Sequence, residues 1–171
     1  ITLEQEQASV QIPISEGPQT RIASVSFRNN LELSSIELLS LVAKTAQLEP
    51  GSPLSSSGVE DARIALIRAY RDRGYIYCRV FSDIIKDKNS TEVQISYRFE
   101  EGLQVHISEV LVRGNRHTRD SFIRNRISFQ EGDVYRLDQA IEDQRKISSL
   151  GVFSSVRLKL IDEDTPAEQK D

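Results

Sequence analysis

Two segments of the chain repeat each other at a distance of 85 residues. Residues 10–30, VQIPISEGPQTRIASVSFRNN, align without a gap with residues 95–115, ISYRFEEGLQVHISEVLVRGN. Apolar positions fall on apolar positions, and Glu16-Gly17 falls on Glu101-Gly102. A period of this length indicates a tandem array of small domains, and this constrains the architecture before any single motif does. The functional question is therefore what an array of copies binds.

The composition agrees with two small globular domains. The 171 residues are 28% charged and 38% hydrophobic, which is typical of a folded chain rather than a disordered one. The net charge of −4 argues against a nucleic-acid partner. No apolar run approaches the roughly 20 residues that a membrane-spanning helix needs. Cys78 is the only cysteine, so an internal disulfide is excluded.

Helical periodicity predicts two helices after the first strand of the first copy. Ser34 with Glu37 three positions later has the form of a capping box. Ser57 and Glu60 can cap a second helix, which we expect to end at Gly74.

Alternating apolar residues predict three strands in the same copy. The first covers residues 22–27, the second begins with the alternation of Ile76, Cys78 and Val80, and the third returns over residues 93–99. The second copy shows the same order of strand, helix, helix and strand. The first copy is longer by four residues in each of two places, which we expect to be loops.

The ends of this pattern divide the chain into three parts. Residues 1–17 hold a returning strand left over from a preceding repeat, residues 18–101 form one repeat, and residues 102–171 form a repeat truncated before its last strand. Val10, Ile12 and Ile14 alternate correctly to complete that sheet in a neighbouring molecule. We therefore expect head-to-tail self-association through residues 10–15. The alternative is a second repeat that stays intact with a two-stranded sheet.

The order and recurrence of these motifs resemble the POTRA (polypeptide-transport-associated) domains of BamA- and TamA-like outer-membrane protein assembly factors. The motifs are the Glu-Gly turn before each first strand, Gly114-Asn115, Tyr70-x-x-x-Gly74-Tyr75 and Leu150-Gly151-x-Phe153-x-x-Val156. The resemblance covers both copies and implies an α+β fold. Each β-α-α-β-β domain would be a small mixed three-stranded sheet covered by two helices. The first copy departs from the pattern at Asn29-Asn30, where asparagine tolerates the left-handed backbone that the turn requires.

The resemblance implies a scaffold rather than an enzyme. It would lie on the periplasmic face of the outer membrane of a Gram-negative bacterium, in a parent chain embedded by a C-terminal β-barrel. Its partners would be unfolded outer-membrane protein polypeptides and the accessory lipoproteins of an assembly complex, and no cofactor or metal is expected. Two alternatives remain open: a POTRA pair of a two-partner-secretion or organellar protein-translocation pore, and a pure subunit-docking adaptor.

In this family the expected mode of binding is β-augmentation, in which an extended client adds a strand to an open sheet edge. The strand after each helix-ending glycine would be that edge. Charged side chains on these strands equally favour the alternative of an edge protected against pairing. The predicted client-binding residues are Ile76, Tyr77, Cys78, Arg79, Val80 and Phe81 in the first copy and Phe153, Ser154, Ser155, Val156, Arg157 and Leu158 in the second.

Other candidate sites carry weaker signals. His106 and His117 have no metal-ligating residue at a suitable spacing, and the alternation around Cys78 places its thiol in the core. A basic cluster is typical of a solvated turn and helix face, or else of a docking surface for an acidic partner or for anionic lipid headgroups. It consists of Arg113, Arg116, Arg119, Arg124 and Arg126.

Overall fold

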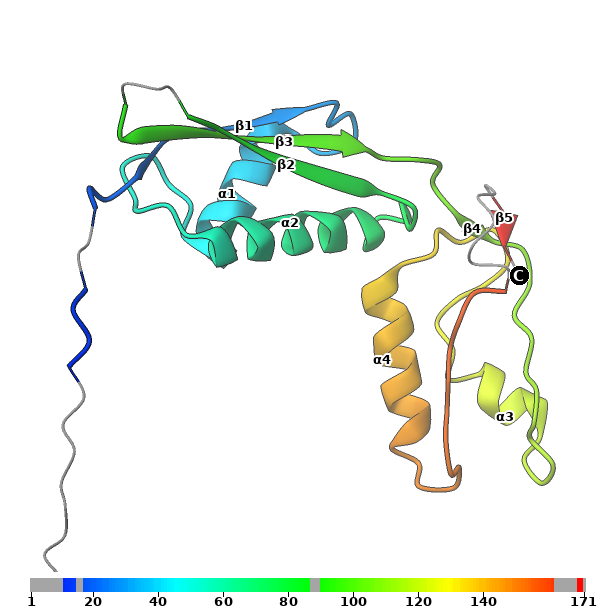
Figure 1. Cartoon of the computed structure of the whole chain (residues 1–171). Helices are drawn as coiled ribbons and strands as arrows, with labels where there is room; N and C mark the ends of the chain where they lie inside the picture. The colour runs from blue at the N-terminus through cyan, green and yellow to red at the C-terminus, as the bar shows by residue number, and fades with distance from the viewer. Residues whose placement is uncertain (1–10, 15–16, 87–89, 162–168, 171) are drawn as a thin grey trace, which may run out of the picture.

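The computed structural model describes residues 11–14, 17–86, 90–161 and 169–170 (Figure 1). The elements of the first repeat are β1 (Arg21–Arg28), α1 (Ser35–Ala46), α2 (Ser56–Arg71), β2 (Arg79–Lys86) and β3 (Glu92–Glu100). Those of the second are β4 (His106–Ile107), α3 (Asp120–Arg124), α4 (Leu137–Ser148) and β5 (Gln169–Lys170). No helix in the described part of the chain is long and apolar enough to cross a bilayer.

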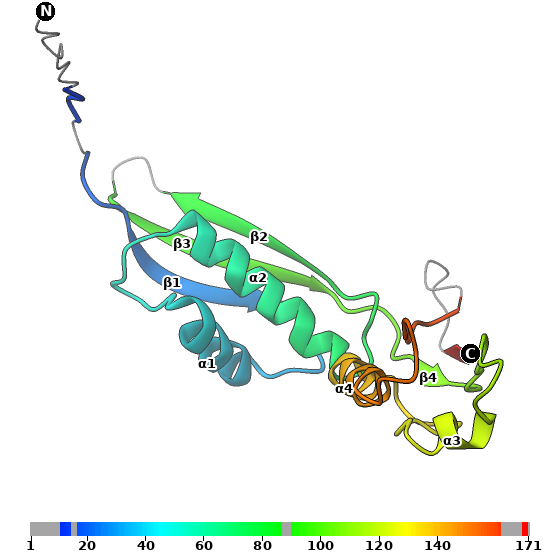
Figure 2. The same cartoon turned by 90° about the horizontal axis from the view of Figure 1, so that it is seen from below.

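The first repeat is a three-stranded sheet with both helices on one face (Figures 1 and 2). Its strand order is β1-β3-β2, with β3 parallel to β1 and antiparallel to β2. The predicted α+β fold, with a mixed sheet covered by two helices, is thus confirmed. The returning strand β3 is central, so both of its edges are paired.

Alternate residues of β3 make the centre of the core. Val93, Ile95, Tyr97 and Phe99 are all at most 2% exposed because they face the helices. Burial of a large apolar side chain stabilises a fold by roughly 1.5–3 kcal/mol, so β3 is a major source of the repeat's stability. The helices cover these residues with Leu38, Val42, Ala62, Leu66 and Tyr70.

The predicted N-terminal cap is observed for α1 but not for α2. The predicted capping box of Ser34 and Glu37 is confirmed, with both reciprocal hydrogen bonds formed. The prediction for the second helix is wrong, because its N-cap is Ser55, whose hydroxyl accepts the Gly58 N–H. Glu60 instead forms an ion pair with Arg63.

The turn after the first strand has the same geometry in both repeats. Asn29 has φ 61° and Gly114, 85 positions later, has φ 87°. The next residue fastens the turn in each repeat, since the Nδ2 of Asn30 and of Asn115 donates a 2.8 Å hydrogen bond to the carbonyl three positions on. The expectation that asparagine can replace glycine here is confirmed.

The helices of the first repeat are longer than their counterparts in the second. Helix α2 has 16 residues and α4 has 12, while α1 has 12 and α3 has 5. Four residues are close to one turn of an α-helix. The expectation of two loop insertions is therefore wrong. Helix α2 exceeds α4 by four residues, whereas α1 exceeds α3 by seven, and the connection from α1 to Gly51 is three residues shorter than the connection from α3 to Gly132.

The second repeat starts its sheet in the register of the first. His106 and Ile107 pair in parallel with Gln169 and Lys170, as Arg21 and Ile22 pair with Glu92 and Val93. Thus β5 lies, relative to β4, where the beginning of β3 lies relative to β1. Beyond these two pairs, the described residues of this repeat form no further ladder.

The two repeats meet through a shared hydrophobic contact. Ile76 from the first repeat is 9% exposed and belongs to the core cluster of the second, where Val105 and Tyr135 lie. The Val105 N–H donates to the Gly74 carbonyl at 2.9 Å, and the Asp138 N–H donates to the Asp72 carboxylate at 3.0 Å. Apolar contact and backbone hydrogen bonds together hold the second repeat against the end of α2 (Figure 1).

Candidate functional site

The first candidate site is the outer edge of β2. One side of β2 pairs with β3. The other side of β2 pairs with no strand among the described residues. The edge runs for eight residues, Arg79–Lys86, which is long enough to take an added strand. An unpaired row of N–H and C=O groups of this length is a template for β-augmentation.

The predicted edge strand begins three residues before the observed one. Ile76, Tyr77 and Cys78 lie in a turn closed by the hydrogen bond from the Cys78 N–H to the Tyr75 carbonyl, so the strand prediction is wrong there. Their alternating burial has another origin. The Ile76 side chain enters the core of the second repeat, whereas Cys78 enters the core of the first.

The rest of the predicted segment does lie on the edge strand. Arg79 is exposed and Val80 is buried in the core, so the alternation of side chains along the strand places Phe81 on the face of the sheet opposite the helices. The guanidinium of Arg98, on the neighbouring strand, lies 4.3 Å from the centre of the Phe81 ring. This cation–π contact fixes an aromatic ring beside the open edge.

The end of the same strand carries two apolar side chains that sequence reasoning did not include. Ile84 is 46% exposed and Ile85 is 51% exposed. Consecutive apolar residues break the alternation, and this was the signal that could have extended the site to Lys86. Together with Phe81, they offer an incoming strand apolar contacts on both faces.

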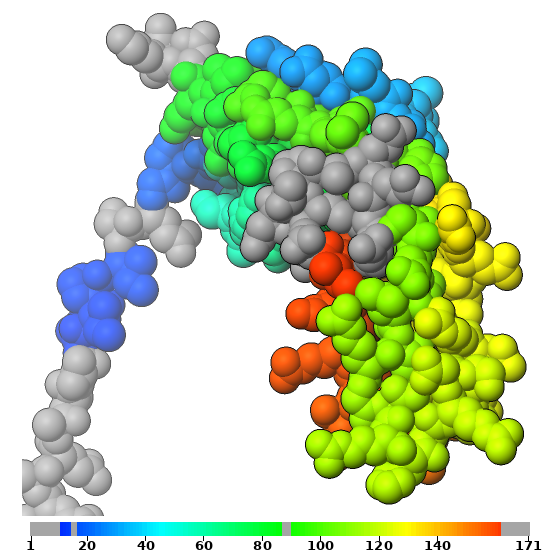
Figure 3. Space-filling model, turned by 90° about the vertical axis from the view of Figure 1, so that its right-hand side faces the viewer, coloured from blue at the N-terminus to red at the C-terminus, as the bar shows by residue number. Residues whose placement is uncertain are grey.

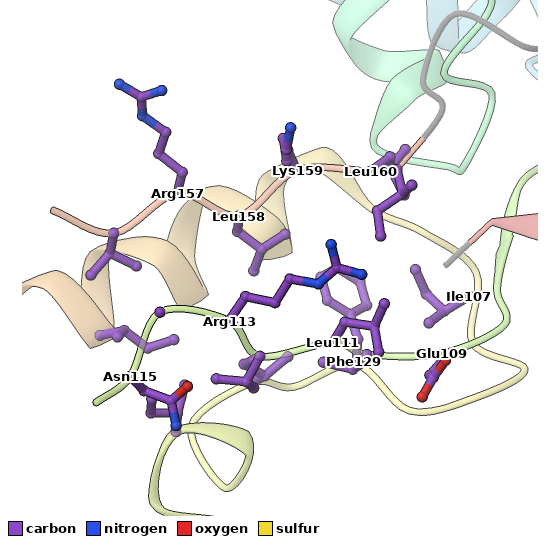
Figure 4. A pocket seen from close by; sticks show the side chains of 18 of the residues that line it. Ile107, Glu109, Leu111, Arg113, Asn115, Phe129, Arg157, Leu158, Lys159 and Leu160 are labelled. Carbon is purple, nitrogen blue, oxygen red and sulfur yellow. The ribbon is translucent and has the colours of Figure 1, made fainter. Parts of the chain in front are cut away.

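The second candidate site is a groove of about 540 Å³ in the second repeat. One wall is the segment 107–115 and the other is the segment 153–161 (Figures 3 and 4). Apolar side chains from the helical layer form its floor, among them Ile123, Phe129 and Ile147. In the first repeat, the corresponding space between β1 and β2 is filled by β3.

The predicted strand at 153–158 is not a strand in the structure. Phe153, Ser155, Val156, Arg157 and Leu158 line the groove, but the segment has no ladder partner among the described residues. The physical reason is that a β-strand is defined by its hydrogen-bonded neighbour, and the part of the chain that the structure describes provides none along this wall. Ser154 is exposed beside the groove and does not line it.

This wall nevertheless keeps the side-chain alternation of a strand. Leu158 and Leu160 point into the groove, whereas Arg157 and Lys159 point away from it (Figure 4). The Leu158 N–H is bound by the side-chain carbonyl of Gln144 at 2.9 Å. The backbone is therefore extended and held in place without a neighbouring strand.

Two arginines of the predicted basic cluster make contacts within the second repeat. Arg124 donates to the Val110 carbonyl, and the Arg126 guanidinium lies 3.7 Å from the centre of the Phe122 ring. Both are thus bound within their own repeat. Arg113 lines the groove, while Arg116 and Arg119 are exposed on the turn before α3.

The remaining candidates have structural roles. Burial raises the pKa of the Cys78 thiol to about 12, so it is protonated and packed in the core as predicted. Among the described residues, no group of three His, Cys, Asp or Glu side chains is placed to hold a metal ion. Tyr70 is fully buried, and its hydroxyl donates to Glu101.

The fold and the open edge together define a tandem α+β repeat of the kind that presents sheet edges. A family model for POTRA, described as a surface antigen variable number repeat, matches the chain twice, over residues 20–102 and 105–170. The chain therefore belongs to the POTRA family.

Curated relatives agree with this assignment. The chain is 21% identical over 171 residues to the outer membrane protein assembly factor BamA of Nitratidesulfovibrio vulgaris, a match that covers 100% of this chain and 21% of the relative. It is 22% identical over 139 residues to the BamA of Neorickettsia risticii, covering 81% of this chain and 18% of the relative. The chain thus spans about a fifth of the length of these relatives.

A solved structure shows the same fold. The crystal structure of Haemophilus influenzae BamA POTRA3-5 superimposes with a TM-score of 0.71 at 23% sequence identity. The match covers 91% of this chain and 60% of that one. The similarity includes both repeats in tandem.

Proposed function

We propose that the chain is a non-catalytic periplasmic scaffold of an outer-membrane protein assembly factor and that it binds unfolded outer-membrane protein segments at the outer edge of β2. The observation that carries this proposal is the eight-residue edge of β2, which is unpaired within the described residues and carries the exposed side chains of Phe81, Ile84 and Ile85. The family and the named relatives support the setting of outer-membrane assembly.

The chemistry of the edge suits a receptor for many sequences. Main-chain hydrogen bonds supply affinity regardless of the client's side chains, while the exposed side chains of Phe81, Ile84 and Ile85 favour apolar client residues. Strands that span an outer membrane have this alternation. The charged side chains of Arg79 and Asp83 then limit pairing with flat apolar strands of other proteins.

The test is an NMR titration of the ¹⁵N-labelled chain with a 12-residue peptide of alternating apolar and polar residues. We expect the amide shifts to concentrate on β2 and to be absent from β1, because the β1 edge lacks the exposed apolar residues. Shifts spread evenly over the surface, or confined to helices, would contradict β-augmentation at β2.

A matched pair of variants makes the test specific. Ile85→Lys places a charge beside the edge, and we expect it to weaken peptide binding about fivefold, the equivalent of about 1 kcal/mol for one cross-strand contact. Ile64→Lys is the control, since Ile64 is 53% exposed on α2, away from the edge, and Ile85 is 51% exposed. Equal loss in both variants would show that charge alone, and not the edge, governs binding.

Accessory proteins of the assembly complex are the second class of partner we propose. Arg116 and Arg119 are exposed on the turn before α3 and are suited to an acidic partner surface. Binding there and not at β2 is the outcome expected of a subunit-docking adaptor. The peptide titration thus separates the two functions.

A further inference from the structure

Three consecutive residues at the end of α2 each accept a hydrogen bond from the second repeat. The carbonyls of Arg73 and Gly74 bind the segment 104–105, at 3.0 Å through the Arg73 carbonyl and at 2.9 Å through the Gly74 carbonyl. The carboxylate of Asp72 instead accepts the N–H of Asp138 at 3.0 Å. Asp138 lies in the first turn of α4, so Asp72 reaches past the connecting segment to a helix of the next repeat.

The N-cap residue of α4 does not cap its own helix. That residue is Arg136, which makes no side-chain capping hydrogen bond. Arginine carries only donors, whereas a cap needs a short side chain with an oxygen that accepts an N–H of the first turn. The corresponding helix of the first repeat, α2, has such a residue, since the Ser55 hydroxyl accepts the Gly58 N–H.

Asp72 takes the position of a cap for α4. Asp138 is the second residue of that helix, and the N–H of the second residue is one of the two that an N-cap side chain binds. A carboxylate there also interacts favourably with the positive end of the helix dipole. Asp72 is itself the C-cap residue of α2, so the end of one repeat's helix meets the start of the next repeat's helix (Figures 1 and 2).

The surroundings of Asp72 favour an acceptor oxygen more than a negative charge. Burial raises the pKa of Asp72 above its ordinary value, and the nearby carboxylate of Asp138 raises it further. The hydrogen bond from the Asp138 N–H and the cations Arg68 and Arg136 act in the opposite direction without outweighing these causes. Asparagine caps a helix as well as aspartate does, so it should serve equally well at this position.

We propose that Asp72 caps α4 from the preceding repeat and thereby holds the two repeats in one fixed orientation. The first turn of α4 keeps its acceptor only while the end of α2 stays in place, because the N–H groups of a first helical turn have no partner within their own helix. The inference holds whether or not β2 binds clients. For the proposed scaffold, its consequence is that the edge of β2 keeps a constant direction relative to the second repeat.

Two NMR measurements on the ¹⁵N-labelled full chain test the proposal. Hydrogen exchange at residues 138–140 reports on the capped turn, and residual dipolar couplings report whether both repeats share one alignment tensor. The parent should show one tensor. Asp72→Ala should exchange about fivefold faster at these amides and give a separate tensor for each repeat.

Both measurements need monomeric protein, because the sequence predicts self-association through residues 10–15. Residues 10 and 15 lie outside the described part of the chain, and residues 11–14 belong to no helix or strand. Sedimentation velocity at the NMR concentration provides this check.

Two variants serve as controls for the lost carboxylate. Asp72→Asn keeps an acceptor oxygen and should behave as the parent does in both measurements. Asp61→Ala removes an exposed carboxylate from the same helix, away from the junction, and should also change neither. If Asp72→Asn matched Asp72→Ala, the charge and not the cap would hold the junction, and the proposal would be overturned.

A second substitution separates the cap from the contact between the repeats. Arg136→Ser gives α4 a cap of its own, as Ser55 gives α2. In Asp72→Ala/Arg136→Ser, exchange at residues 138–140 should return to the parent's rate while the two tensors stay separate. If Asp72→Ala leaves the second repeat unfolded, this double variant should refold it. The proposal fails if Asp72→Ala keeps either the parent's exchange or its single tensor, or if the double variant recovers neither slow exchange nor the fold.

Discussion

The hydroxyl of Tyr70 donates a 2.7 Å hydrogen bond to Glu101 Oε1, and this bond joins the end of α2 to the linker between the repeats. The same oxygen accepts the backbone N–H groups of Leu31 and Glu32 at 2.6 and 3.1 Å. One carboxylate thus fastens the loop after β1, the second helix and the connection to the next repeat. Burial and this carboxylate raise the pKa of Tyr70 far above its ordinary range, so the hydroxyl is always a donor.

Tyr70→Phe should therefore destabilise the first repeat. The phenyl ring still fills the core, but Glu101 loses its only side-chain donor from α2, and a lost hydrogen bond to a charged group costs about 1.5–3 kcal/mol. Urea unfolding followed by circular dichroism measures the difference. Tyr75→Phe is the control, because its hydroxyl donates to Glu32 at an exposed site and should change stability by less than about 0.5 kcal/mol. Equal losses in the two variants would contradict the role assigned to Glu101.

Gly74 lies at the junction between the repeats. Comparing Gly74→Ala with Gly132→Ala should distinguish the cost of backbone strain from the cost of a clash between the repeats. Gly74 has φ +92°, and a Cβ placed there would lie 2.5 Å from Val134 Cγ1 in the second repeat. Gly132 has a nearly equal φ of +89°, with nothing within 4 Å of such a Cβ. Gly132→Ala should thus lower the free energy of unfolding through backbone strain alone, by about 1–3 kcal/mol.

Gly74→Ala should lose clearly more stability than Gly132→Ala, and it should also loosen the junction. The added methyl group pushes Val134 away and weakens the neighbouring hydrogen bond from the Val105 N–H to the Gly74 carbonyl. Small-angle X-ray scattering should then report a larger radius of gyration for Gly74→Ala only. If both variants kept the parent's scattering profile and lost equal stability, the repeats would not depend on close approach at Gly74.

The sequence predicts the repeat, the order of elements in its first copy and the start of α1, because these depend on local patterns. The capping box at Ser34 and the left-handed turn at Asn29 need only neighbouring residues. The alternation of Ile76, Cys78 and Val80 predicts burial but not which core receives each side chain, so it places Ile76 on the wrong element. That choice depends on where the next repeat packs.

The candidate sites were predicted only in part, for a related reason. An edge strand such as β2 is recognised from family strand order, but its exposed Ile84 and Ile85 follow from the position of its neighbour. For the groove, the sequence predicts only that the second repeat lacks its returning strand. Its floor and its Arg113 rim arise from side chains that are distant in sequence, which no single-sequence pattern connects.

Asp143 shows how a charged residue can belong to a core, and it gives a prediction that depends on pH. It is fully buried on α4, where its carboxylate accepts the N–H and the hydroxyl of Ser128, the amide of Gln139 and a long contact from Lys146. Burial alone would raise the pKa of Asp143, but these hydrogen bonds outweigh burial and lower it. They anchor α4 to the loop before Phe129, which lies at the floor of the groove.

A lowered folded-state pKa means that Asp143 stabilises the second repeat above the unfolded pKa of about 4 and loses this effect as the pH falls through the folded value. Asp143→Asn turns an amide NH₂ toward groups that are themselves donors, so at pH 7 it should cost about 2–3 kcal/mol. The difference in the free energy of unfolding between the parent and Asp143→Asn, measured by urea unfolding, should become smaller as the pH is lowered from 6 to 3. Glu142→Gln, at an exposed neighbour whose contact with Lys146 is 3.9 Å, should leave stability nearly unchanged across the same range. A gap for Asp143→Asn that stays constant down to pH 3 would mean that the carboxylate acts by its shape and not by its charge.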